Sequence, residues 1–114
     1  MKTKTPLEDQ LTEALYAFNL AQSDLEFAEN AYFSAENAYS SAYHEYNLAF
    51  YDYVRSCTPE NYDRQHQAAQ LMSYRNQKAN EAKLNRKLAV CKFKKAKRLY
   101  EKLKRKQEKQ QEKY

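Results

Sequence analysis

The sequence predicts an all-α fold in which two long helices form an antiparallel coiled-coil hairpin within a single domain, residues 1–114. Three observations predict it: the chain has no Gly, only two Pro, and a heptad repeat of alanines. Without Gly it lacks the residue that most readily takes positive φ in tight β-hairpin turns. The rest is dominated by strong helix formers such as Ala, Leu, Glu, Lys and Gln.

Two matching signals mark where the helices begin. Thr5-Pro6 and Thr58-Pro59 each place a capping Thr before a Pro at the first helical position, and Glu8 completes a capping box with Thr5. We therefore expect helix one over about 6–57, a turn over about 57–59 and helix two over about 59–108. The basic C-terminal end has little of helix one to pack on, so we expect it to fray.

A heptad repeat defines the face that helix one buries. Large side chains recur every seven residues, and an Ala follows each of the first six by three positions. This pattern predicts an Ala-rich coiled-coil seam. The large residues are Leu11, Phe18, Leu25, Tyr32, Tyr39, Tyr46 and Tyr53, and the small ones are Ala14, Ala21, Ala28, Ala35, Ala42 and Ala49.

Helix two carries a weaker version of the same pattern, interrupted by Arg75 and Arg86, where we expect looser packing. Folding the chain back at the turn sets large residues against small ones, for example Phe93 against Ala28 and Tyr100 against Ala21. A register shifted by one heptad is an alternative. The two stripes of helix two are Met72, Ala79, Arg86, Phe93 and Tyr100, and Ala68, Arg75, Ala82, Ala89, Ala96 and Leu103.

One seam does not use all the apolar residues. A hairpin buries one stripe per helix, so the remainder predicts an exposed surface for a partner. The alternatives are dimerisation into a four-helix bundle, docking of a different protein, or a locally bent helix that covers its own surface. The residues expected on this surface are Tyr16, Leu20, Phe27, Tyr43, Leu48, Phe50, Tyr51, Leu84 and Leu88.

Charge is divided unequally between the two halves. Residues 1–57 hold three basic and nine acidic residues, whereas residues 58–114 hold 17 basic and six acidic ones. The basic excess could contact nucleic-acid phosphates, an anionic membrane or an acidic protein, or it could form a solvated helix end. The candidate anion contacts are Lys92, Lys94, Lys95, Arg98, Lys102, Lys104, Arg105 and Lys106.

Residues that carry catalysis are scarce. A phosphate-binding loop requires Gly, and the Asp63–His66 pair lacks the further carboxylates of a helical metal site. Cys57 and Cys91 have no CxxC spacing, which favours a reducing, cytoplasmic location. We expect no catalytic residue, no metal, no cofactor, no small-molecule substrate and no membrane span.

These observations predict a non-catalytic protein–protein interaction module that acts as an adaptor, inhibitor or assembly factor. The alternative is a nucleic-acid-binding helical protein that uses the basic end of helix two. The predicted architecture is similar in shape to Rop-type RNA-binding hairpin dimers and to small phage inhibitors of host defence, so we expect a bacterial or phage setting.

Overall fold

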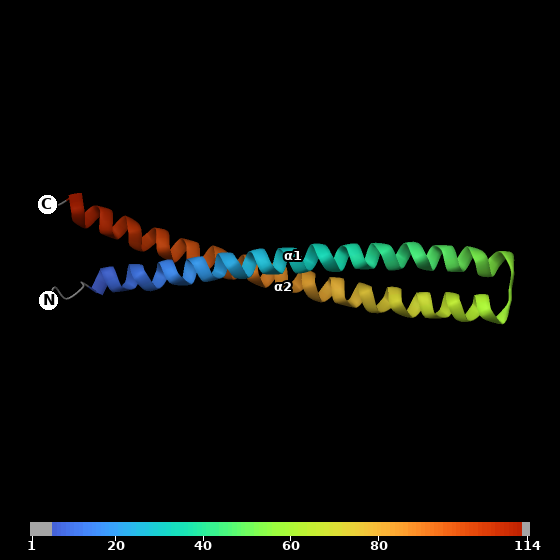
Figure 1. Cartoon of the computed structure of the whole chain (residues 1–114). Coiled ribbons are helices and arrows are strands. Elements are labelled where there is room, and N and C mark those ends of the chain that lie inside the picture. Colours follow the sequence, from blue (N-terminus) through green and yellow to red (C-terminus); the bar gives the residue numbers. More distant parts are fainter. Residues whose placement is uncertain (1–5, 113–114) are drawn as a thin grey trace. The chain divides into compact units, whose positions relative to one another are not determined.

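The computed structural model describes residues 6–112 and confirms the all-α hairpin. It contains helix α1, Pro6–Arg55, and helix α2, Pro59–Glu112 (Figure 1). The predicted Thr5 cap lies outside the described residues. α2 continues four residues past the end expected near 108, because Gln, Glu and Lys favour helix and nothing in this segment breaks it.

The turn between the helices spans residues 56–58 and begins earlier than predicted, because α1 ends at Arg55 instead of near residue 57. Pro59 disfavours helical dihedrals at Thr58, so the chain must leave the helix before it. Thr58 then caps α2: its Oγ1 accepts a hydrogen bond from the Asn61 amide at 3.1 Å. The Thr58 amide donates to the Ser56 carbonyl at 2.8 Å.

Asn61 closes the turn from the other side. Its Nδ2 donates to the carbonyls of Ser56, at 2.8 Å, and Asp52, at 3.4 Å. The Ser56 carbonyl lies just past the end of α1, and the Asp52 carbonyl, in the last turn of α1, also accepts from the Ser56 amide at 3.0 Å. The first turn of α2 therefore supplies a cap for α1, a role that the sequence analysis missed.

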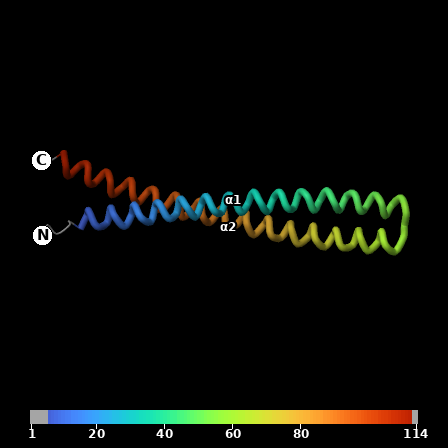
Figure 2. The backbone as a smooth tube through the Cα atoms, viewed as in Figure 1, coloured from blue at the N-terminus to red at the C-terminus, as the bar shows by residue number. Residues whose placement is uncertain are grey.

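Two compact units divide the hairpin, each containing one segment of both helices. The terminal unit comprises Met1–Ala28 and Arg86–Tyr114, and the turn unit comprises Glu29–Asn85. In the terminal unit, the segments of α1 and α2 run side by side in opposite directions (Figure 1). In the turn unit, the chain reverses its direction between α1 and α2 (Figure 2).

Aromatic contacts fix the register of the terminal unit. The Phe18 ring lies 5.4 Å from that of Phe93 and 5.8 Å from that of Tyr100, measured between centroids. The first register predicted above pairs Ala21 with Tyr100. It would place Phe18 opposite a position of α2 that lies about one heptad beyond the one that Phe18 contacts. The contacts favour the alternative register, because a turn over residues 56–58 is centred on Cys57 and the chain folds back earlier than the first register requires.

The Ala-rich seam forms as predicted in both units, although its core is thin. All seven large heptad residues of α1 are half-buried. Among residues 6–112, the buried apolar residues are six alanines and one leucine, and no polar residue is buried. Arg75 leaves the seam and is exposed, with its guanidinium carbon 5.8 Å from the ring of Tyr74. The buried residues are Ala14, Ala21, Ala42, Ala49, Ala79, Ala89 and Leu103.

Candidate interaction surfaces

The seam leaves every residue of the predicted apolar surface exposed. Phe27 is the most exposed of them at 76%. Within residues 6–112, seven further large apolar residues are exposed outside the a/d stripes. They are Leu15, Phe33, Val54, Tyr62, Leu71, Tyr74 and Leu99. The only feature of the sequence that indicates their exposure is their position outside the a and d stripes.

Heptad geometry sorts these residues into surfaces. Positions a and d form the seam, e and b lie on one side of it, g and c lie on the other, and f lies behind. On α1, Tyr43 and Phe50 occupy e positions, whereas Leu48 occupies a c position. On α2, Tyr62 is an e position and Leu71 a g position. Antiparallel helices set e beside e and g beside g, so each unit has two distinct flanks.

Aromatic rings gather on one side of the turn unit, which we call the aromatic flank: the e and b positions from Ser40 to Val54 and from Tyr62 to Ser73. Tyr53 of α1 and Tyr62 of α2 meet edge to face at 5.9 Å, and the His66 ring stacks on Tyr62 at 6.1 Å. Further along α1, the Phe50 ring lies 6.2 Å from that of Tyr46. The aromatic contacts therefore continue from the seam onto the flank.

This aromatic flank contains no formal charge. Its positions hold no Asp, Glu, Lys or Arg, and the polar members are Ser, Asn and His. Depletion of charged residues together with enrichment in Tyr and Phe is the composition of the core of a protein interface. The members are Ser40, Tyr43, Asn47, Phe50 and Val54 on α1, and Tyr62, His66, Ala69 and Ser73 on α2.

The opposite side of the turn unit, its charged flank, has a different character. Arg64 bridges the two helices by an ion pair to Asp52 at 2.8 Å, and Leu48 and Leu71 line a shallow groove beside it. Lys78 pairs with Glu81 at 3.5 Å. Both ion pairs are exposed to water, so they contribute little to stability and mark this flank as a solvated surface.

The terminal unit combines apolar and basic groups on one flank. Leu20 and Phe27 occupy c positions of α1, and Leu88 and Leu99 occupy c and g positions of α2. All four are exposed. On the same flank of α2, Lys92 and Lys95 lie between the leucines, and Lys102 and Lys106 lie beyond Leu99. The α1 part of this flank holds two acids, Glu13 and Asp24. We call this surface the basic apolar flank.

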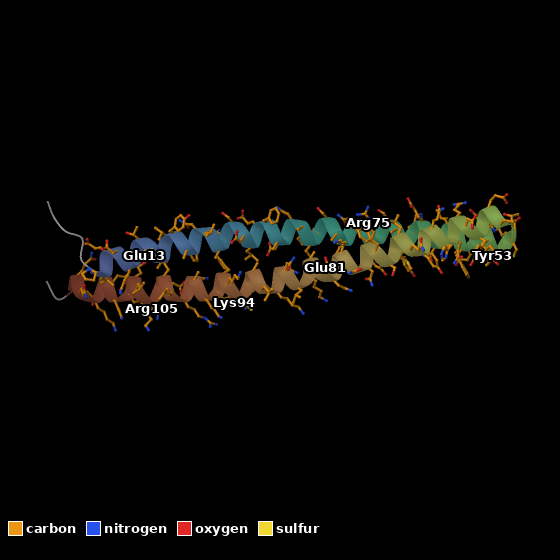
Figure 3. The ribbon with its side chains drawn as sticks, turned by 90° about the horizontal axis from the view of Figure 1, so that it is seen from below. Glu13, Tyr53, Arg75, Glu81, Lys94 and Arg105 are labelled. Atoms are coloured by element: carbon orange, nitrogen blue, oxygen red, sulfur yellow. The ribbon has the colours of Figure 1, made fainter. Side chains whose placement is uncertain are left out.

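The basic residues of α2 extend into solvent. Figure 3 shows Lys94 and Arg105 projecting from α2 away from α1. Among the candidate anion contacts, all of which are described, an ion pair is formed only by Arg105, to Glu101 at 4.0 Å. The acids of α1 therefore do not neutralise these cations by direct contact.

The remaining polar groups have surface roles. His66 shares a 3.3 Å hydrogen bond with Gln70, and the Cys57 thiol donates to the Tyr53 carbonyl at 3.3 Å. Cys57 and Cys91 are both free and exposed. Within residues 6–112, no three His, Cys, Asp or Glu side chains gather as a metal site would require, and neither helix is apolar over a length that could cross a membrane.

The chain matches no protein-family model, and comparison with curated proteins and with solved structures gives no significant match.

Proposed function

We propose that the chain is a non-catalytic interaction protein that docks the exposed flanks of its coiled coil on a partner protein, as an adaptor, inhibitor or assembly factor. One observation supports this proposal above others: Leu20 and Phe27, 51% and 76% exposed, lie two helical turns apart on a side of α1 that the seam leaves uncovered. Contiguous exposed apolar surface marks interaction sites in soluble proteins.

The charges on the same flank suit an acidic partner. Lysines surround Leu88 and Leu99 on the basic apolar flank, and Lys92 and Lys95 have no ion pair within 4.0 Å among the described residues. An amphipathic helix with acidic margins would match such a surface, its apolar face on the leucines and its carboxylates near the lysines.

A matched pair of charge variants tests this proposal. The Leu20→Asp/Phe27→Asp variant adds two carboxylates to the basic apolar flank. The Asn19→Asp/Gln22→Asp variant adds the same two charges at exposed positions on the other side of α1. We expect the first variant to lose the proteins that the immobilised wild-type chain captures from extract, and the control to retain them. Equal capture by both, with unchanged helicity, would contradict the proposal.

Nucleic-acid binding is the second candidate, and the exposed cations of α2 favour it, because only Arg105 among the candidate anion contacts forms an ion pair. Replacing Lys102, Arg105 and Lys106 with Gln removes three exposed charges and keeps the buried Leu103. If these cations contact phosphates, the slope of log K against log salt for duplex DNA should fall by about 0.9 per contact. Absence of binding to duplex DNA and to RNA at low salt would exclude this candidate.

A further inference from the structure

We propose that the aromatic flank of the turn unit binds a second copy of this chain, so that the protein is a homodimer. This inference rests on the proposed function, because it takes an uncovered apolar flank to be an interface. It goes further by assigning the partner of one flank and leaving the basic apolar flank to a different protein.

The exposed area of the whole chain is large enough for an interface. The chain has an accessible surface of 9239 Å² and a mass of 13.6 kDa. A compact monomer of that mass exposes about 6,600 Å². The excess of about 2,600 Å² exceeds the roughly 800 Å² per partner that a stable interface buries. Dimerisation on one flank would therefore leave further surface for another partner.

The distribution of charge favours the aromatic flank over the terminal unit as the surface for self-association. A two-fold interface brings the same patch of both copies together, so any net charge on the patch faces itself. The turn unit holds five basic and seven acidic residues, a net of −2, and none of them lies on the aromatic flank, because Glu29, Glu36 and Lys83 occupy e positions beyond its ends. The terminal unit holds 15 basic and eight acidic residues, a net of +7, so its self-docking would be opposed by repulsion.

The side chains of this flank also suit an interface with a second copy of the chain. Tyr43, Phe50 and Tyr62 are each between 42% and 50% exposed, so one side of each ring is already held by the hairpin. Rings fixed in this way lose less conformational entropy on association than mobile side chains. The tyrosine hydroxyls can remain hydrated at the rim, or bond to Asn47 and Ser73 of the second copy.

Two double variants with matched exposure test the inference. Tyr43→Glu/Phe50→Glu charges the aromatic flank at positions that are 50% and 42% exposed. Leu48→Glu/Leu71→Glu charges the other side of the same unit at positions that are 47% and 41% exposed. Glu is a strong helix former, so circular dichroism should show unchanged helicity in both variants. Sedimentation equilibrium then gives the mass of each full-length protein.

We expect the wild type and the Leu48→Glu/Leu71→Glu variant to approach twice 13.6 kDa at about 100 μM. The Tyr43→Glu/Phe50→Glu variant should remain monomeric, a loss of at least about 100-fold in dimer affinity. A monomeric wild type at this concentration, or equal dissociation of both variants, would overturn the inference. Neither result depends on Leu20 or Phe27, so the capture experiment still decides the proposed function.

Discussion

Tyr53 and Tyr62 meet edge to face across the turn, with ring centroids 5.9 Å apart. This contact joins the last heptad position of α1 to an exposed e position of α2. The contact therefore connects the seam to the aromatic flank. In this way the fold of the turn determines where the rings of the aromatic flank lie. The short turn brings these rings together, and the seam supports them from behind.

The first prediction concerns the contact of Phe18 with Phe93 and Tyr100. Replacing Phe18 with Ala removes a half-buried ring, and we expect the free energy of unfolding to fall by about 2 kcal/mol, less than for a fully buried Phe. Urea unfolding followed by circular dichroism measures this change. Phe27→Ala, at a ring 76% exposed, should change stability by less than about 0.5 kcal/mol. Equal effects of the two variants would contradict the register.

The second prediction concerns the Asn61 cap. Asn61→Ala removes the two hydrogen bonds that Asn61 donates to the carbonyls of Asp52 and Ser56. Relative to Asn37→Ala, at an exposed position on α1, we expect a loss of about 1 kcal/mol. The comparison corrects for the higher helix propensity of Ala, because both variants gain it. Identical unfolding midpoints would show that the turn does not need this cap.

The third prediction concerns the small residues of the seam. Ala49 is 2% exposed, so Leu at this position must push the helices apart or take a strained rotamer. We expect Ala49→Leu to lower the free energy of unfolding by about 1–3 kcal/mol. Ala31→Leu, at an exposed position of the same helix, should be nearly neutral. A more stable Ala49→Leu protein would mean that the helices are not closely packed there.

Most of the fold could be predicted because its signals are local and periodic. The Thr58-Pro59 step marks the turn, and six alanines at heptad spacing fix the buried face of α1. The register could not be fixed, because a shift by one heptad sets the same residue types against one another. Only contacts between distant residues, such as Phe18 with Tyr100, distinguish the two registers.

The candidate surfaces could be predicted only in part, for a related reason. Residues outside the a and d stripes were expected to be exposed, and Leu20, Phe27 and Phe50 are exposed. Which of them share a flank depends on how α1 and α2 pair. Tyr62 was missed because it lies one turn inside α2, where nothing local indicates that Tyr53 and His66 lie beside it.

Cysteine accessibility can show whether association covers the aromatic flank. Ser40 and Ser41 are adjacent and exposed, but Ser40 lies on the aromatic flank and Ser41 on the charged flank. In a chain with Cys57 and Cys91 replaced by Ser, the alkylation rates of Ser40→Cys and Ser41→Cys are measured as protein concentration rises. We expect the Ser40→Cys thiol to react more slowly as the flank becomes covered, while the Ser41→Cys thiol keeps its rate. Rates independent of concentration at both positions would contradict an interface on the aromatic flank.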